Sequence, residues 1–375
     1  MKRICCFILG FLLLIPALAL GEYEQYRLTE PHKASGAYRR EIFPLDTHNV
    51  IVRVIAPDDG WHTDWYNDGE LTGRLVSQGD WDRLTTVEPV FLTGGALLAL
   101  CRIESDADAD KAYPPPNAAA YWTENGLTQI TPVPERVVAT CWGNRIVVFE
   151  TDEYIRIRFD GKDTMVSPKP EEYVSWGSLV PLADEVFLVK YQDEAAGSQL
   201  MCLDHGNIRY RITIPSHRIL PDGQGGFFNP EWDVAEWTLA RDLSPVRMRH
   251  YDADGQFDRV FRLYSSQGIL TPLVTVPDPE TGTLVLYGSV ADNTGLRGVF
   301  TMTLDGNMNA TNVRVWNIDP DYRKCEAEYD LIALSANGCP WVYLRNRDNP
   351  DNPSPAAVPF SALEESDEDW GIVLE

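Results

Sequence analysis

One hairpin pattern recurs along the chain and limits what the chain can fold into. An aromatic or aliphatic residue ends a strand-like run, Asp or Asn with Gly turns the chain, and a second run begins. Gly, Asn and Asp tolerate the positive φ angles that tight hairpins need. The pattern ends at six glycines: Gly69, Gly126, Gly161, Gly206, Gly255 and Gly306. Their intervals are 57, 35, 45, 49 and 51 residues, with a mean of about 47.

A repeat of this length with about four strands in each unit is typical of β-propeller blades. The clearest unit predicts strands at 136–141, 145–149, 154–158 and 162–166, in runs rich in β-branched and aromatic residues. The repeat predicts an all-β, seven-bladed β-propeller of four-stranded antiparallel blades. Six blades and eight blades are alternatives, and a pair of β-sandwiches is a further one.

The last repeat lacks the Asp-Gly hairpin. Its strands are expected at 331–334 and 341–344, and no turn signal introduces another. A closed ring leaves no unpaired sheet edges that could aggregate. We therefore expect a terminal segment, either Tyr23–Leu28 or Trp370–Leu374, to supply the outer strand of the last blade.

The first 21 residues resemble a secretory signal peptide. Lys2 and Arg3 precede an apolar run from Ile4 to Leu20, and small residues lie before Gly21. We expect residues 1–21 to be removed and residues 22–375 to form a single β-propeller domain, secreted or in the cell envelope. An uncleaved membrane anchor is the alternative, although 17 residues is short for a bilayer. The later sequence contains no other stretch apolar enough to span a membrane.

The chain is strongly acidic, with a net charge of −24. Removing Lys2 and Arg3 with the signal makes this charge −26. Such a charge argues against nucleic acid and anionic lipid as ligands, because both are polyanions. It favours cationic partners or neutral glycans.

Five cysteines follow the signal segment, so at least one has no partner within the chain. Cys325 and Cys339 flank one predicted strand and are the best disulfide candidates in an oxidising compartment. No Cys or His spacing predicts a zinc site. Asp106–Asp110 alternates carboxylates like a calcium loop, but Lys111 and Asn117 stand where that loop needs Gly and Glu. We therefore expect no cofactor, with loosely bound Ca²⁺ as the alternative.

The repeat period and the Asp-Gly hairpins resemble bacterial secreted β-propeller proteins, from about residue 38 onward. The resemblance implies the fold alone, since this architecture carries both binding proteins and enzymes. The WD40 pattern is absent, because Trp81-Asp82 and Trp232-Asp233 do not recur at regular blade ends. The stretch Tyr121–Glu124 is similar to the YWTD motif of receptor propellers but occurs once.

Motifs of hydrolases, metalloproteases and nucleotide-binding proteins are absent from the sequence. His62, His205 and His250 fall in or beside predicted third strands, where surface or packing roles are expected. His217 follows a predicted connection between blades and could face the central mouth, but no partner for a catalytic base is evident.

The functional hypothesis rests on loops that share one face of a propeller. Aromatic side chains beside carboxylates suit sugar stacking or a protein hot spot. The alternative is that these aromatic residues pack between blades. The expected binding residues are Trp61, Asp80, Trp81, Tyr113, Trp176, His217 and Tyr322.

These observations favour an exported, non-enzymatic binding propeller that recognises protein or glycan through a loop-rich face. The alternative is a propeller glycosidase or lyase that uses carboxylates at the central mouth. A scaffold that only assembles with envelope partners is a third hypothesis.

Overall fold

A computed structural model gives the fold. It describes residues 39–44, 48–56, 60–67, 70–76, 84–93, 96–103, 118–123, 126–132, 135–141, 146–193, 197–216, 218–232, 245–278, 281–292, 295–318, 332–334, 340–344 and 356–375.

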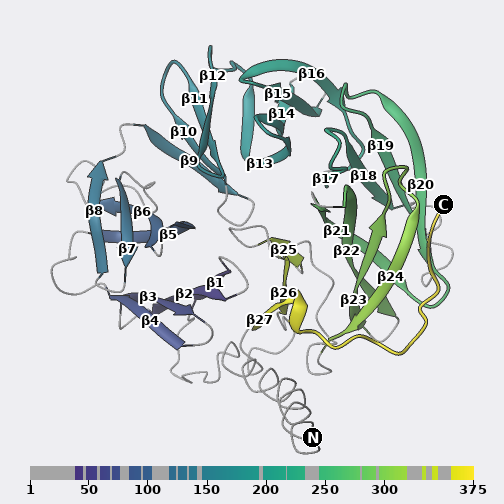
Figure 1. The fold of residues 1–375 in the computed structure, drawn as a ribbon. Coiled ribbons are helices and arrows are strands. Elements are labelled where there is room, and N and C mark those ends of the chain that lie inside the picture. Colours follow the sequence, from purple (N-terminus) through teal and green to yellow (C-terminus); the bar gives the residue numbers. More distant parts are fainter. Residues whose placement is uncertain are drawn as a thin grey trace, which may run out of the picture.

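The described strands form seven antiparallel sheets, named A to G in chain order. Figure 1 shows these sheets arranged in chain order around a common centre, with sheet G beside sheet A. The fold is therefore an all-β propeller of antiparallel sheets. Sheet A contains β1 (Arg39–Pro44), β2 (Asn49–Ala56), β3 (Gly60–Asn67) and β4 (Glu70–Val76). Sheet B contains β5 (Leu84–Thr93), β6 (Ala96–Ile103), β7 (Ala118–Thr123) and β8 (Gly126–Pro132).

The next two sheets border the candidate site described below. Sheet C contains β9 (Arg136–Cys141), β10 (Ile146–Glu150), β11 (Ile155–Phe159) and β12 (Lys162–Val166). Sheet D contains β13 (Tyr173–Ala183), β14 (Val186–Asp193), β15 (Gly197–Asp204) and β16 (Asn207–Thr213).

The last three sheets include the C-terminal segment. Sheet E contains β17 (Leu220–Pro221), β18 (Phe227–Trp232), β19 (Val246–Tyr251), β20 (Phe257–Ser265) and β28 (Ile372–Leu374). Sheet F contains β21 (Ile269–Asp278), β22 (Thr283–Asp292), β23 (Gly295–Leu304) and β24 (Ala310–Asn317). Sheet G contains β25 (Ile332–Leu334), β26 (Pro340–Leu344) and β27 (Ala356–Pro359), followed by the 3₁₀ turn η4 (Phe360–Ala362).

The six predicted hairpins are confirmed, and each joins the third and fourth strands of one sheet from A to F. In sheet C the turn residues Asp160 and Gly161 have φ angles of 48° and 76°. In sheet D the corresponding angles of His205 and Gly206 are 48° and 80°. Two successive positive φ angles define the two-residue turn whose twist matches that of the strands.

The expectation of seven uniform four-stranded blades is wrong in its strand count. Sheet E has five strands, and sheet G has three among the described residues. Within the segment 370–374, residues Ile372–Leu374 form strand β28, but β28 pairs with β20 of sheet E rather than with the last sheet. Its register places Leu374 opposite Leu263, where both residues join the apolar packing between sheets E and F. Residues 23–28 lie outside the described part of the chain.

The core lies between neighbouring sheets. Strand β15 shows why, because its central residues are all apolar and alternate in direction. Met201 and Leu203 pack in a cluster with residues of sheet C. Leu200 and Cys202 pack in a separate cluster with Phe227 and Tyr251 of sheet E. A strand buried on both faces needs such a continuous apolar run, since successive side chains point to opposite faces.

Equivalent clusters join the later sheets. Sheets E and F share one that includes Phe228, Met248 and Phe300, and sheets F and G share another that includes Val299 and Val342. Each described cluster therefore belongs to two sheets, so neither sheet of a pair is stabilised independently of the other.

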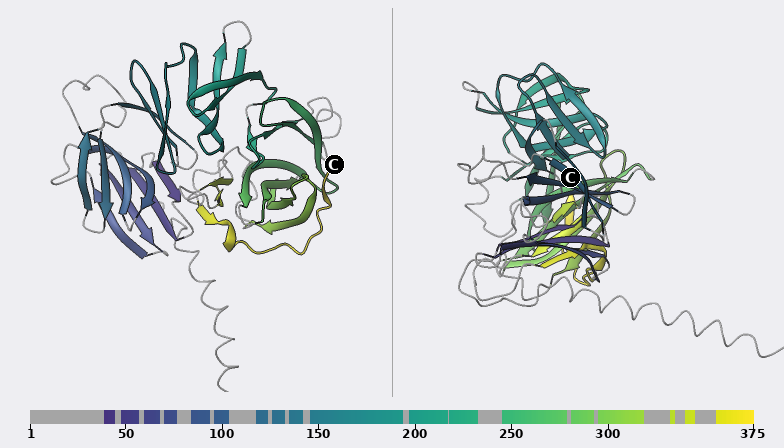
Figure 2. Two further views of the ribbon diagram at one scale, coloured as in Figure 1. Left: turned by 45° about the horizontal axis from the view of Figure 1, so that its top comes forward. Right: turned by 90° about the vertical axis from the view of Figure 1, so that its left-hand side faces the viewer.

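The C-terminal segment, residues 360–375, runs along the outer side of sheets F and E (Figure 2). The backbone N–H of Asn317 donates to the carbonyl of Glu364, and the N–H of Ser366 donates to that of Val315. Further along, Arg262 and Glu375 exchange two backbone hydrogen bonds of 2.7 and 3.0 Å. Trp370 lies between these attachment points and is buried in the cluster of sheets E and F.

We predict that Trp370→Ala lowers the free energy of unfolding by about 3–5 kcal/mol, because it removes a large side chain from a packed cluster. Urea denaturation followed by fluorescence measures this loss. Val373→Ala is the matched control on the same C-terminal segment, since Val373 is 39% exposed. This control should cost less than about 1 kcal/mol. Equal effects of the two substitutions would contradict the packing role of Trp370.

Candidate functional site

An open groove lies where the chain passes from sheet C to sheet D. Its volume is about 1060 Å³. That size is just above the range of pockets that hold small molecules, about 300–1,000 Å³. The lining runs from the end of β12 through the connection to the start of β13, and includes the end of β14 and the start of β16. The lining residues are 166–173, Gln192 and 206–208.

Two backbone features fix the walls of this groove. The connection after Val166 contains Pro168 and Pro170, and the Ser167–Pro168 peptide is cis. On the other side, the turn at Gly206 lies directly against β12. A Cβ atom at Gly206 would lie 1.8 Å from the carbonyl oxygen of Met165, so only glycine fits there. Val166 is buried between the sheets and anchors the start of the connection.

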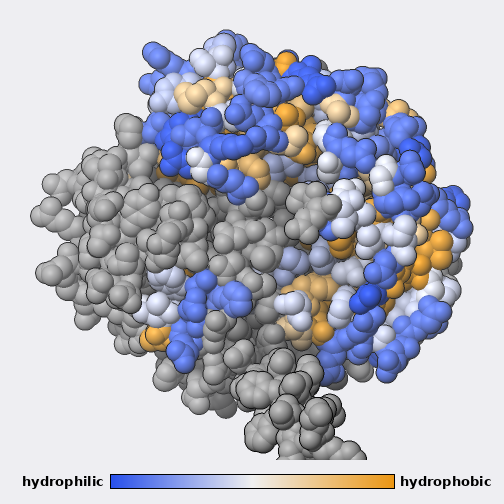
Figure 3. Space-filling view, viewed as in Figure 1, coloured by the Kyte–Doolittle hydropathy of each residue, from blue (hydrophilic) through white to orange (hydrophobic). Residues whose placement is uncertain are grey.

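The groove exposes apolar side chains to solvent. Tyr173, the first residue of β13, is 78% exposed, and Ile208 is 41% exposed. Met165, next to the groove on β12, is 44% exposed. Figure 3 shows a mainly hydrophilic described surface over the upper sheets, with smaller hydrophobic areas among them. Exposed apolar residues that gather beside a groove are a common mark of a binding surface.

The charged groups of the groove are mostly paired. Lys169 Nζ lies 2.5 Å from Glu150 Oε1, and Glu172 forms an ion pair with Arg211. The Arg211 guanidinium also lies 5.5 Å from the ring centroid of Tyr191. Glu171 is exposed and makes no hydrogen bond or ion pair with any described residue. The groove therefore retains one uncompensated negative charge, two residues before the exposed ring of Tyr173.

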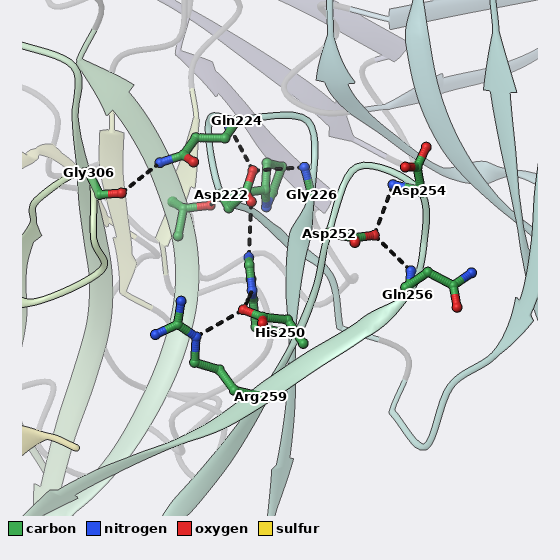
Figure 4. A network of polar contacts seen from close by, with 12 residues as sticks. Asp222, Gln224, Gly226, His250, Asp252, Asp254, Gln256, Arg259 and Gly306 are labelled. Carbon is green, nitrogen blue, oxygen red and sulfur yellow. Dashed lines mark hydrogen bonds and ion pairs between the residues drawn. The ribbon is translucent and has the colours of Figure 1, made fainter.

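A second polar cluster lies inside sheet E, around His250 of β19 (Figure 4). His250 Nε2 lies 3.0 Å from Asp222 Oδ2, and His250 Nδ1 lies 3.0 Å from Asp258 Oδ2. Asp258 also accepts a hydrogen bond from Arg259 Nε. The imidazole packs against the rings of Phe228 and Phe261, with centroids 5.0 and 6.2 Å away. Two carboxylates accept hydrogen bonds from both nitrogens only when the imidazole is protonated.

Burial acts to lower the pKa of His250, but the hydrogen bonds and charges of Asp222 and Asp258 outweigh burial and raise this pKa. The pKa of Asp258 is lowered, first by its hydrogen bond from Arg259 and then by that from His250. With both ring nitrogens bound to carboxylates, His250 has no lone pair available to accept a proton. The cluster is therefore a structural connection between the β17–β18 turn and β19 rather than a catalytic base.

Asp222 also organises its own turn. Its Oδ1 accepts hydrogen bonds from the backbone N–H groups of Gln224 and Gly226, at 2.7 and 2.9 Å. Asp252 and Asp305 do the same in the turns that join the third and fourth strands of sheets E and F. The Oδ1 of each accepts hydrogen bonds from the backbone N–H groups two and four residues later. The recurring Asp therefore stabilises these turns by accepting their otherwise free N–H groups.

The structure tests few of the residues expected to bind a ligand. Trp176 was expected to be exposed on a connection between sheets, but it is buried in the cluster of sheets C and D. Strand β13 begins three residues before Trp176, so this side chain points into the packing between the sheets. Trp61 lies at the start of β3, and its side chain is outside the described part. Also outside it are Asp80, Trp81, Tyr113, His217, Tyr322, Cys325 and Cys339.

Two expectations for histidines are confirmed. His205 is exposed at the β15–β16 turn, and His250 is buried among aromatic rings. Among the described side chains, no group of three or more His, Cys, Asp or Glu residues is arranged to hold a metal ion. The Asp106–Asp110 stretch lies outside the described residues.

Sequence reasoning missed Tyr173 and Glu171. The signal was present, since Glu171-Glu172-Tyr173 places an aromatic residue directly after two carboxylates. Periodicity did not show where β13 begins, so the exposed position was assigned to Trp176.

No protein-family model and no curated protein sequence matches the chain. Among solved structures it is similar to BBS1N in complex with ARL6DN, at 10% identity and a TM-score of 0.35, covering 85% of this chain and 95% of that one. It is also similar to Hsv2 of Kluyveromyces lactis, at 10% identity and a TM-score of 0.32, covering 88% and 98%. A protein of unknown function from Bacteroides caccae has 10% identity and a TM-score of 0.28, covering 69% and 94%. TM-scores this low carry no inference about function.

We predict that Asp222→Asn lowers the free energy of unfolding by about 3–5 kcal/mol, because it leaves the buried imidazolium without one of its counter-charges. Asp252→Asn is the matched control, since Asp252 stabilises the same kind of turn on the surface. Its amide oxygen can still accept the two N–H groups, so the loss should stay below about 1.5 kcal/mol. If urea denaturation shows equal losses of unfolding free energy for the two variants, the contact between Asp222 and His250 does not stabilise the fold.

The raised pKa of His250 predicts a fall in stability with rising pH. The folded chain holds this proton more tightly than the unfolded chain. The contribution is therefore complete below about pH 6.5 and is lost as the pH rises through the raised value. Unfolding free energies measured across this interval should decline for the wild type and stay flatter for His250→Gln. His205→Gln, at an exposed site, is the control and should keep most of the wild-type change of unfolding free energy with pH. If His250→Gln shows the full wild-type change, the pH dependence does not come from His250.

Proposed function

We propose that the chain is an exported, non-enzymatic binding propeller whose partner docks in the groove between sheets C and D. In this proposal residues 1–21 are removed as a signal peptide, and residues 22–375 act as one domain outside the cell or in its envelope. Among the described residues, no helix has both the length and the apolar character that crossing a membrane requires.

The observation that carries this proposal is the exposed ring of Tyr173 on the wall of a large groove. Tyrosine is enriched among the residues that dominate binding energies at interfaces, because its ring supplies a large contact area at a low cost in conformational entropy. The ring lies at the start of a strand whose later residues are buried in the core. The sheet therefore fixes the backbone of Tyr173 before any partner arrives, which reduces the cost of ordering on binding.

The polar groups of the groove support binding rather than hydrolysis. A glycosidase needs two carboxyl groups facing each other across a bond at a set separation. Glu171 and Glu172 are successive residues of one connection, and Glu172 is already bound to Arg211. The groove also combines the aliphatic side chain of Ile208 with proline residues. Such a lining complements the apolar side chains of a protein better than the hydroxyl groups of a glycan.

Binding of the purified mature chain to a peptide array and to a glycan array tests the proposal. We expect specific peptides to bind the wild type and to lose about tenfold or more in affinity with Tyr173→Ala, as at other tyrosine hot spots. Val313→Ala is the control, because Val313 is an exposed apolar residue on β24 of sheet F. It should leave binding unchanged.

Three other results would overturn the protein-partner proposal. Binding to glycans alone would reassign the groove to sugar recognition. Peptide binding that is equally strong in Tyr173→Ala would place the interaction elsewhere on the protein. Cleavage of an arrayed glycan, lost in Glu171→Gln, would favour the glycosidase hypothesis.

A further inference from the structure

We infer that the partner of the groove presents a lysine- or arginine-bearing segment, whose cation binds between the Tyr173 ring and the Glu171 carboxylate. This inference rests on the proposed function, because it names the chemistry of the partner at that same groove. Tyr173, Glu171 and the charges around them carry the argument.

The Tyr173 ring is available to a cation from outside. It is 78% exposed and has no ring, cation or hydrogen-bond contact with any described residue. Other cation–ring pairs on these two sheets are already formed within the chain. Arg156 lies 3.9 Å from the ring centroid of Phe149, and Arg211 lies 5.5 Å from that of Tyr191. The face of an aromatic ring attracts lysine and arginine, with arginine the more frequent partner.

The carboxylate of Glu171 is the group in the groove with no counter-charge. Lys169 is held by Glu150, and Arg211 is held by Glu172, so neither cation is released to neutralise Glu171. Glu150 also forms an ion pair with Arg136, which holds the Lys169 side of the groove in a fixed arrangement. A cationic side chain from a partner could therefore contact both the Glu171 carboxylate and the Tyr173 ring. These two residues are two positions apart in the sequence, and neither group has a partner among the described residues.

The charge of the whole chain adds a longer-range effect. A net charge of −24 raises the local concentration of cationic partners and speeds their association. A polyanionic partner would be repelled. The size of the groove, about 1060 Å³, allows several residues of a segment to enter beside the cation. Ile208 and the connection prolines would then contact the apolar residues that flank it.

The test uses the purified mature chain and a fluorescent synthetic peptide in which lysines alternate with valine and threonine. Anisotropy titrations compare this probe with a peptide of the same sequence in which every lysine is acetylated. Acetylation removes the charge and retains the length of the side chain. We expect the acetylated peptide to bind about tenfold more weakly or worse, and we expect added salt to weaken the lysine probe more than the acetylated one.

Matched variants locate the effect in the groove. Glu171→Gln should weaken binding of the lysine probe about two- to fivefold, the range of an exposed ion pair. Glu368→Gln, at an exposed position on the C-terminal segment, changes the net charge equally and should have little effect. Tyr173→Ala should weaken binding of the probe, whereas Tyr173→Phe should retain it, because phenylalanine keeps the face of the ring. Melting temperatures of the four variants within a few degrees of the wild type would confirm that they fold.

The outcomes separate this inference from the proposed function. If neutral or acidic peptides bind in a Tyr173-dependent way while the lysine probe does not, the groove is a peptide site and the cation inference is wrong. If Glu171→Gln and Glu368→Gln weaken binding equally, the effect is one of net charge and the inference is also wrong. If no peptide depends on Tyr173, the proposed function itself fails.

Discussion

The packing of sheets D, E and F against the sheet on either side is the interaction on which the rest of the described structure depends. Alternate residues of β15 enter two different clusters, one shared with sheet C and one shared with sheet E. The same arrangement continues from sheet E to F and from F to G. Because the apolar residues of sheets D, E and F are buried in clusters shared with their neighbours, the stability of each of these sheets depends on the sheets beside it. The turns and the polar clusters are built on that frame.

The groove arises where this packing stops. Strand β12 ends at Val166 and β13 begins at Tyr173, so residues 167–172 connect sheets C and D and line the groove. Trp176 falls inside the packed region and is buried, whereas Tyr173, only three residues earlier, falls beyond it and is exposed. Within a single strand, one aromatic residue therefore belongs to the core and another to the surface. The His250 cluster shows the converse case, in which polar groups are tolerated inside a sheet because they satisfy one another.

Much of the fold could be predicted from the sequence because its turns require special backbone angles. Asp160-Gly161 and His205-Gly206 adopt positive φ, and all six predicted hairpins join the third and fourth strands of their sheets. The strand count could not be predicted, because the pairing of β28 with β20 depends on contacts between residues more than 100 positions apart. The candidate site was harder still. The exposed position of Tyr173 is the first residue of β13, and apolar periodicity does not define strand ends.

The outer edge of sheet E has a consequence for how the protein is made. Strand β20 is synthesised long before its outermost partner β28, which follows every other strand in the chain. Until the segment ending at Glu375 emerges, the N–H and carbonyl groups of Arg262 that pair with it have no strand to bond. An uncovered strand edge can pair with other chains, so a newly made molecule is exposed to misassembly at this edge until β28 covers it.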